Sequence, residues 1–270
     1  MYSFHSETHK GKLRTNNEDY FLNSEIEGGH IFVVCDGMGG HNGGEIASKI
    51  AANALVDFFK SSKIDNIPFQ FNMALAETHS VILSEANKST SLKGMGTTLV
   101  AIIIYNQKCY LAHIGDSRAY AIFDDQMISL TKDHSLVQHL INAGELTEKE
   151  AQSHPRRNVI TKALGTSFDS KDDYFDGEIS LPENSYLLLC TDGLNGMIND
   201  QEILEAFTLK DPERIAESLI QKALEAGGKD NITVSVLKVE SSNSNGFSHN
   251  TKFQSKPKKH GILKFINRLK

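Results

Sequence analysis

Four aspartates of this sequence share a local context that suits metal binding. Asp36 follows the apolar run IFVVC, Asp192 follows LLLCT, and each precedes a glycine. Asp116 stands between AHIG and Ser117, and Asp230 lies just before the run ITVSV. If these strands adjoin, the carboxylates converge at one sheet edge, where like charges are costly unless a cation lies between them. Hard oxygen ligands of this kind favour magnesium or manganese.

Each feature also has a simpler interpretation when it is taken alone. Asp-Gly is a common turn pair, although its recurrence after apolar runs favours the metal hypothesis. The glycines between Gly37 and Gly44 allow close backbone approach to a ligand, but they match neither a Walker motif nor the Gly-x-Gly-x-x-Gly spacing. Arg14 is either a solvated surface residue or, beside a carboxylate cluster, a clamp for a phosphate group.

The pattern of apolar residues predicts the elements that position these side chains. Short β-branched apolar runs predict strands over residues 31–35, 97–105, 109–114, 118–123, 127–130, 186–190 and 232–239. Helical spacing predicts helices over residues 43–60, 69–86, 200–207 and 212–226. Asp200 and Asp211 are the expected N-caps of the last two helices. The strands between 97 and 130 are expected to form one antiparallel meander, and the whole pattern predicts an α+β sandwich.

Charge is unevenly distributed along the 270 residues, whose net charge is -6. Residues 241–270 carry seven basic side chains and no acidic one, so the first 240 hold 21 basic and 34 acidic side chains, a net of -13. An acidic body argues against nucleic acid as the main ligand and suits a protein that gathers cations. The longest apolar run has seven residues, whereas a membrane-spanning helix needs about 20.

The cysteines and the N-terminus indicate a cytoplasmic protein. Cys35, Cys109 and Cys190 each lie in an apolar strand-like run, which predicts buried thiols in a reducing compartment. Residues 1–19 are polar and lack the apolar core of a signal peptide. We expect a monomer.

Eight short motifs follow one another along the chain: RTNNED, DGMGGHNGGE, GMGTT, IGDSR, DHSLVQ, HPRRNVITKALG, TDGL and GKDNITV. In these motifs and their order, the chain resembles the metal-dependent serine/threonine protein phosphatases of the 2C class (the PPM family) in their bacterial form. The resemblance covers roughly residues 3–239. It implies a four-layer α-β-β-α sandwich, in which helix pairs flank two antiparallel sheets. It also implies a phosphatase domain over residues 1–240, with a mobile flap at about 133–165, followed by a linker and basic tail over 241–270.

The resemblance implies a centre of two Mn²⁺ or Mg²⁺ ions. Asp36 would bridge both metals, and the carbonyl of Gly37 would bind one of them. Asp192 and Asp230 would hold the other metal. Asp116, together with Asp192, resembles the third-metal site of bacterial members.

Further site residues follow from the same motifs. Glu18 and Asp19 would bind a metal directly or through water, and the sequence does not separate the two. Arg14 would clamp the substrate phosphate. Asn158 would assist at the third metal.

One position departs from the family pattern. Eukaryotic relatives carry a histidine after Asp-Gly, a candidate general acid for the leaving alkoxide, whereas this chain has Met38, which cannot donate a proton. His41 is nearby, either as a catalytic group or as a local cap or packing residue. A metal-bound water is the other candidate acid.

The implied activity is hydrolysis of phosphoserine and phosphothreonine in proteins by metal-activated water, opposing a bacterial serine/threonine kinase. A second hypothesis is a pseudo-phosphatase that keeps the fold as a binding module. The presence of Arg14, Asp36, Asp192 and Asp230 argues against it. A third is a related enzyme acting on a regulator such as an anti-sigma antagonist, which the catalytic residues do not distinguish.

The tail lies outside the resemblance. If its last residues form a helix, the apolar side chains fall mainly on one face, with basic ones beside them: Ile262, Leu263, Phe265, Ile266 and Leu269, with Lys264, Arg268 and Lys270. Such a segment, within residues 252–270, suits peripheral contact with an anionic membrane or an acidic partner. The alternative is a disordered solubilising tail.

Overall fold

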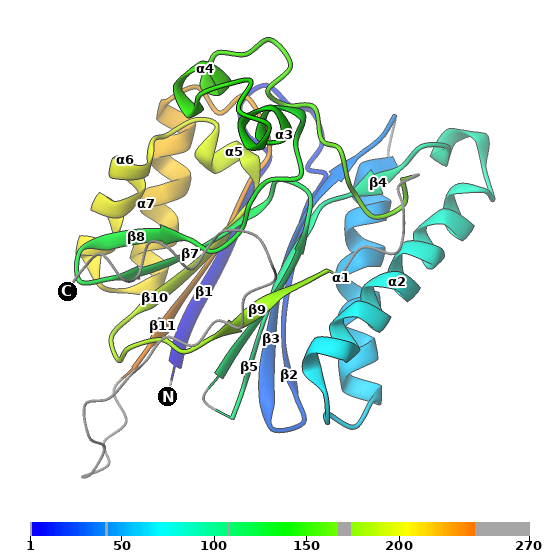
Figure 1. The fold of residues 1–270 in the computed structure, drawn as a ribbon, viewed down its shortest axis with the longest axis horizontal. Helices are drawn as coiled ribbons and strands as arrows, with labels where there is room; N and C mark the ends of the chain where they lie inside the picture. Colours follow the sequence, from blue (N-terminus) through cyan, green and yellow to red (C-terminus); the bar gives the residue numbers. More distant parts are fainter. Residues whose placement is uncertain (1, 41–42, 107, 167–173, 241–270) are drawn as a thin grey trace.

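The computed structural model describes residues 2–40, 43–106, 108–166 and 174–240. Two antiparallel sheets lie at the centre, and helices cover their outer faces (Figure 1). One sheet has the order β1-β11-β10-β7-β8, formed by β1 (Tyr2–His9), β7 (Arg118–Phe123), β8 (Gln126–Ser129), β10 (Tyr186–Cys190) and β11 (Ile232–Val239). The other has the order β2-β3-β5-β6-β9, formed by β2 (Asp19–Ile26), β3 (Gly29–Met38), β5 (Leu99–Tyr105), β6 (Lys108–Ile114) and β9 (Phe175–Ile179), while β4 (Gly96–Thr97) pairs with β3.

A pair of long helices, α1 (Gly43–Ser61) and α2 (Ile67–Ala86), covers the sheet that contains β3, and α1 packs on β2 and β3. The other sheet is covered by α6 (Asp200–Ala206) and α7 (Pro212–Glu225), and α7 packs on β1 and β11. Shorter elements are α3 (Leu136–Asn142), α4 (Glu148–Gln152), α5 (Asp192–Asn195) and the 3-10 turns η1 (Thr90–Leu92) and η2 (Phe207–Leu209). Within the described residues, no helix combines the length and hydropathy needed to cross a membrane.

The run IFVVC in β3 shows why the molecule has four layers. Ile31 and Val33 belong to the core cluster beneath α1 and α2, whereas Phe32 and Val34 belong to the cluster between the two sheets. Successive side chains of a strand point to opposite faces, so a strand that is apolar at every position must be covered on both. A third cluster joins the other sheet to α6 and α7. The predicted four-layer α-β-β-α sandwich is confirmed.

The predicted single meander is wrong, because the chain changes sheets after β6. β5 and β6 pair in one sheet, while β7 and β8 pair in the other. Gly115 makes the crossing with φ at +105°, a conformation that disfavours residues with a Cβ, and a Cβ there would lie 2.5 Å from the side chain of Thr98. The crossing therefore places Asp116 between the sheets.

Two local predictions about helices have different outcomes. Asp211 caps α7 as expected, since its carboxylate accepts the backbone N–H of Arg214 at 3.1 Å. The N-cap of α6 is Asn199 and not Asp200, because Asn199 and Glu202 form a reciprocal capping box. Such a box satisfies two backbone donors that would otherwise lack partners. The three cysteines are free and buried, as predicted.

Candidate metal centre

The predicted acidic residues lie at one end of the two sheets. Asp19 opens β2 and is the register partner of Asp36, near the end of β3. Asp116 lies at the sheet crossing, Asp192 begins α5 directly after β10, and Asp230 lies just before β11. The structure therefore brings together carboxylates from both sheets, as the strand-end pattern requires.

The charges of these carboxylates disfavour one another. Burial, followed by the neighbouring charges of Asp19, Asp192, Asp116 and Asp230, raises the pKa of Asp36 well above its ordinary value. Burial, supported by the negative charge of Asp192, raises the pKa of both Asp19 and Asp116 to about 7. In Asp19, hydrogen bonds from two threonine hydroxyls partly oppose this rise in the pKa. Burial, followed by Asp230, raises the pKa of Asp192. A bound divalent cation would reverse this electrostatic cost.

Two buried oxygens in this cluster have no hydrogen-bond partner, Oδ1 of Asp19 and Oδ1 of Asp116. Buried polar atoms are nearly always paired, and an exception is one sign of an ion site. Of the residues described, no three His, Cys, Asp or Glu side chains are gathered closely enough to enclose an ion. Magnesium commonly keeps several waters and uses only one or two carboxylates, so the unpartnered oxygens are the more informative observation. The donor set fits Mg²⁺ or Mn²⁺.

The other oxygen of Asp19 is fixed by two threonines of the opposite sheet. Oδ2 accepts hydrogen bonds from Oγ1 of Thr191 at 2.9 Å and from Oγ1 of Thr233 at 2.7 Å. These contacts leave Oδ1 as the atom available to a metal. Neither threonine was a candidate from the sequence, although Thr191 immediately precedes Asp192 in the motif TDGL.

Asp36 is held by its backbone. Its N–H donates to Oγ1 of Thr98 at 3.0 Å, and its carbonyl accepts from Oγ1 of Thr97 at 2.9 Å. At Gly37, a Cβ would lie 2.1 Å from the carbonyl oxygen of Gly44 at the start of α1. The glycine after Asp36 is therefore required by the close approach of α1 to β3.

Asn231 connects the N-terminal loop to this end of the sheets, although nothing in the motif GKDNITV distinguishes it from its neighbours. Its amide donates to the carbonyls of Lys10 and Asn16, both at 2.9 Å, and its Oδ1 accepts the N–H of Glu18 at 2.8 Å. It therefore positions both Glu18 and the loop that carries Arg14. Burial, partly offset by Arg14, raises the pKa of Glu18.

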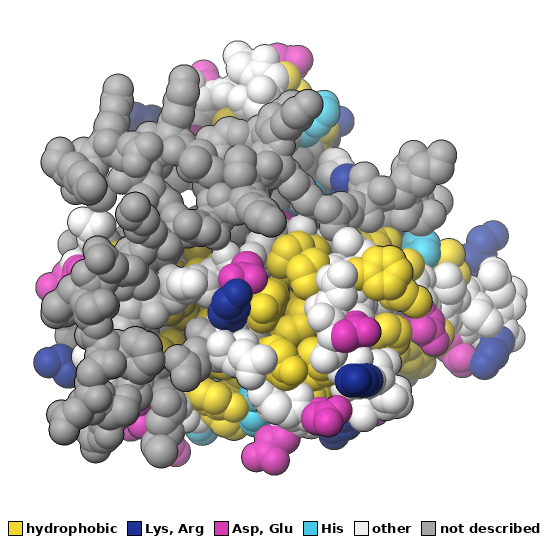
Figure 2. Space-filling view, turned by 60° about the horizontal axis from the view of Figure 1, so that its bottom comes forward, with side chains coloured by type: hydrophobic (Ala, Val, Ile, Leu, Met, Phe, Trp, Pro, Cys, Tyr) yellow, Lys and Arg dark blue, Asp and Glu magenta, His cyan; other side chains and the backbone are white. Residues whose placement is uncertain are grey.

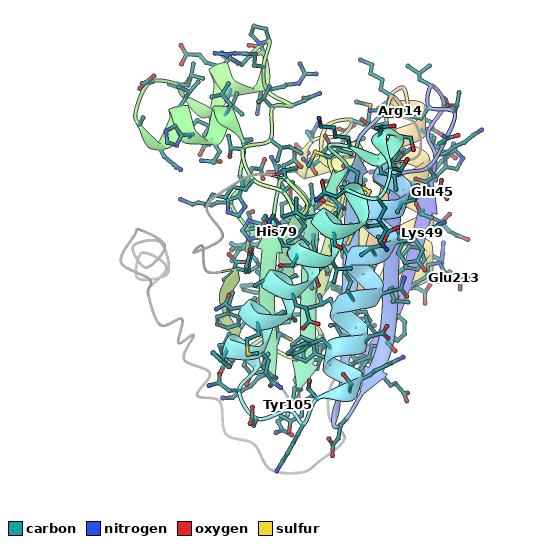
Figure 3. The ribbon with its side chains drawn as sticks, turned by 90° about the vertical axis from the view of Figure 1, so that its right-hand side faces the viewer. Arg14, Glu45, Lys49, His79, Tyr105 and Glu213 are labelled. Carbon is teal, nitrogen blue, oxygen red and sulfur yellow. The ribbon has the colours of Figure 1, made fainter. Side chains whose placement is uncertain are left out.

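Arg14 lies at the solvent boundary of the cluster, and Figure 3 shows it at the opposite end of the molecule from Tyr105, the last residue of β5. Its Nη2 is 2.7 Å from Oδ2 of Asp230, and half of its side chain is exposed. Desolvation opposes its charge, but the carboxylates of Asp230, Glu18 and Asp36 leave its pKa above the ordinary value. The guanidinium is therefore charged and accessible to an anion.

Three further residues considered in the sequence analysis are His41, Asn158 and Met38. His41 lies outside the described residues. Asn158 is exposed in the segment 133–165, called the flap below, which contains α3 and α4 and stands above this end of the sheets (Figure 1). Met38 ends β3 and pairs with Gly96.

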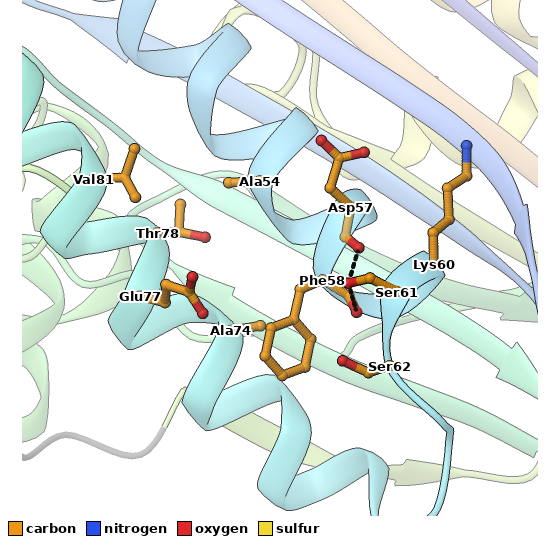
Figure 4. A pocket seen from close by; sticks show the side chains of 10 residues that line it. All are labelled: Ala54, Asp57, Phe58, Lys60, Ser61, Ser62, Ala74, Glu77, Thr78 and Val81. Atoms are coloured by element: carbon orange, nitrogen blue, oxygen red, sulfur yellow. Dashed lines mark hydrogen bonds between the residues drawn. The ribbon is translucent and has the colours of Figure 1, made fainter.

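A groove of about 720 Å³ lies elsewhere, between α1 and α2 (Figure 4). Its lining includes Phe58, Val81, Asp57 and Glu77, none of which belongs to the carboxylate cluster. Figure 2 shows hydrophobic side chains gathered on the side of the molecule away from the flap, interspersed with charged ones. The groove and these apolar surface side chains are therefore not part of the carboxylate cluster.

Similarity to known proteins agrees with this geometry. Residues 8–226 match the family described as protein phosphatase 2C. The serine/threonine phosphatase Stp of Listeria innocua is 37% identical over 237 residues, covering 84% of this chain and 92% of that protein. The crystal structure of the Mycobacterium tuberculosis serine/threonine phosphatase PstP has a TM-score of 0.81 at 34% identity, covering 89% of this chain and 99% of that one. Another structure, the PstP catalytic domain in complex with two manganese ions, has a TM-score of 0.78 at 32% identity, covering 89% and 99%.

The chain therefore belongs to the protein phosphatase 2C family. It is an enzyme, a protein serine/threonine phosphatase, and the predicted family is confirmed.

Proposed function

We propose that this phosphatase hydrolyses phosphoserine and phosphothreonine in proteins with water activated by two divalent metals, Mn²⁺ or Mg²⁺. One observation carries the proposal: five aspartates from both sheets interact electrostatically at one end of the sheets, two of them with buried unpartnered oxygens, beside the half-exposed guanidinium of Arg14. Bound metals supply a nucleophile from water near neutral pH and neutralise phosphate oxygens. From β3, Asp36 would bind both metals and the Gly37 carbonyl one of them. Asp192 and Asp230 would hold the other metal from the second sheet.

The chain's own residues have the following roles in this proposal. Arg14 exchanges its contact with Asp230 for the substrate phosphate and orients it. Thr191 and Thr233 fix Asp19 so that its free oxygen faces the cluster. Asn231 positions Glu18, which acts directly or through water.

Asp116 is the proposed ligand of a third metal, with Asn158 assisting from the flap. Asp116 differs from the other aspartates because its position depends on the sheet crossing at Gly115. Met38 cannot act as the general acid, since its side chain has no proton to donate.

The finer biological setting is also proposed. A cytoplasmic, monomeric phosphatase with a charged clamp for phosphate would reverse the action of a bacterial serine/threonine kinase. Residues 252–270 would add peripheral contact with an anionic membrane or an acidic partner, because they combine basic and apolar side chains.

The test is hydrolysis of p-nitrophenyl phosphate and a phosphothreonine peptide with Mn²⁺. We expect activity to disappear with a chelator and to fall at least about 100-fold in Asp36→Asn and Asp192→Asn, because the metals activate the water. The matched control is Asp57→Asn, which removes an exposed carboxylate on α1 and should leave activity unchanged. Full activity in either cluster variant would refute the metal assignment.

A further inference from the structure

His113 is a buried histidine of β6 whose two ring nitrogens both face hydrogen-bond acceptors. Nδ1 lies 2.6 Å from Oδ2 of Asp176 on β9, and Nε2 lies 2.9 Å from the carbonyl oxygen of Lys132. The side chain is only 4% exposed. A neutral imidazole donates from one nitrogen only, so it would leave a lone pair facing an acceptor. The imidazolium satisfies both contacts.

The surroundings of His113 favour this positive charge. Burial opposes it, but Asp176, the Lys132 carbonyl and Asp133 together raise the pKa of His113 above its ordinary value of 6.5. The ring of His134 stacks on that of His113 at 4.6 Å with an interplanar angle of 13°. Nδ1 of His134 accepts the N–H of Gly115 at 3.1 Å, so that nitrogen carries no proton. An imidazolium at His113 would therefore stack on an imidazole whose Nδ1 carries no proton.

These contacts fix residues 132–135, called the flap root below. His113 binds the carbonyl of Lys132, and Arg118 binds the carboxylate of Asp133 through two hydrogen bonds of 2.8 and 2.7 Å. The N–H of His134 donates to the carbonyl of Gly115 at 2.8 Å. The flap root is thus attached to the residue that immediately precedes Asp116.

The C-terminal end of the flap also contacts the flap root. The N–H of Thr161 donates to the carbonyl of His134 at 2.8 Å, and Ser135 forms a bridge with Ile160. Both ends of the flap therefore depend on the position of His134. His134 in turn depends on the ring of His113 beneath it and on Gly115 beside it.

We propose that His113 is a positioning residue: as an imidazolium near neutral pH, between Asp176 and Lys132, it fixes the flap root on β6 and thereby holds Gly115 and the adjacent Asp116. None of its hydrogen bonds reaches the carboxylate cluster directly, so it acts through the backbone and through His134. Its consequence for substrates rests on the proposed phosphatase function and on contact of the flap with protein substrates, whereas its charge and its effect on the flap root do not.

The first test measures the charge on the full-length protein. Ring ¹⁵N shifts would be recorded near neutral pH, and the signals of His113 would be assigned by their loss in His113→Gln. We expect both ring nitrogens to have the shifts of protonated nitrogen at a pH where most histidines are largely neutral. An unprotonated shift for either nitrogen at that pH would overturn the proposal, whether or not the enzyme is active.

The second test compares Asp176→Asn with Glu178→Gln. Both carboxylates lie on β9, but Glu178 pairs with the exposed Lys108 and not with His113. In Asp176→Asn we expect the amides of Gly115, His134 and Thr161 to exchange their hydrogens about tenfold faster, because a charge-assisted contact is lost. Exchange should be unchanged in Glu178→Gln. Equal exchange in the two variants would refute the positioning role.

A kinetic measurement connects this role to substrates. Asp176→Asn should raise KM for a phosphothreonine peptide about tenfold, while kcat for p-nitrophenyl phosphate changes less than about threefold. If neither substrate is hydrolysed by any form, the proposed function fails, but the shift and exchange measurements still decide the role of His113. Equal losses of kcat on both substrates would contradict flap positioning.

Discussion

Arg14 shows how a single residue links a buried cluster to solvent. Its guanidinium contacts Asp230 at 2.7 Å and remains half exposed, so it can approach an incoming phosphate without a large rearrangement. An exposed ion pair of this kind contributes little to stability. We infer that the arrangement serves binding and not folding.

Replacing Arg14 by alanine should therefore impair catalysis without destabilising the fold. We expect kcat/KM for a phosphothreonine peptide to fall about 10- to 100-fold, corresponding to about 1.5–3 kcal/mol for a hydrogen bond to a charged group. Arg14→Lys should fall between the wild type and alanine, since it keeps the charge but loses the planar fork. Arg214→Ala, an exposed arginine on α7, is the control. An Arg14→Ala enzyme with unchanged kcat/KM would exclude the clamp.

His113 predicts a pH dependence of stability. Its pKa is raised in the folded protein above the ordinary value of 6.5. The folded state therefore binds the proton more tightly, and the resulting stability is fully present below about pH 6.5 and is lost as the pH rises through the folded pKa. Urea unfolding across this range should show the loss in wild type and a smaller loss in Asp176→Asn. Parallel pH profiles for the two proteins would contradict this linkage.

At the scale of elements, the buried central strands were predicted, whereas of the four strands at sheet edges only β8 was. Central strands such as β3 and β5 are apolar at nearly every position and were predicted. The strands β1, β2 and β9 were not, and each lies at a sheet edge, where polar residues on the open side obscure the pattern. The sheet crossing at Gly115 was also missed, since sequence shows that β6 and β7 are strands but not that they belong to different sheets.

Within the site, the aspartates could be predicted from the sequence, whereas the residues that orient them could not. Asp36, Asp116, Asp192 and Asp230 were found because the strand-end context repeats. Thr191, Thr233 and Asn231 were not, since a hydroxyl or amide that orients another residue has no distinct sequence pattern. Their roles depend on contacts between residues more than 40 positions apart, such as Thr191 with Asp19.

The contact between β3 and α1 gives a prediction at this scale. Gly37→Ala would place a Cβ 2.1 Å from the carbonyl of Gly44 and 2.5 Å from that of Glu18, so either α1 or β3 must shift. We expect a loss of about 1–3 kcal/mol or more in the free energy of unfolding, together with loss of activity. Gly40→Ala is the matched control, because a Cβ at Gly40 meets nothing within 4 Å. Urea unfolding of the two variants measures the difference, and equal stability would show that the approach is not tight.

At the scale of the whole molecule, the charge asymmetry has two separate origins. Six of the 34 carboxylates lie at or beside the cluster: Glu18, Asp19, Asp36, Asp116, Asp192 and Asp230. Bound divalent metals would offset part of the net -13 of residues 1–240 at this end of the molecule. The seven basic residues of 241–270 belong to a segment beyond the match to the phosphatase family, which ends at residue 226.

The tail should therefore affect where the enzyme binds and not how fast it hydrolyses a small substrate. We expect the full chain to float with vesicles containing anionic lipid and a form truncated after Glu240 not to, because basic residues near such a surface each contribute about 1 kcal/mol. Flotation should weaken with salt and be absent with neutral vesicles. Hydrolysis of p-nitrophenyl phosphate should be the same for both forms, since the tail contains no proposed metal ligand. Equal flotation of the two forms would exclude membrane contact by the tail and leave an acidic partner as the surface to test.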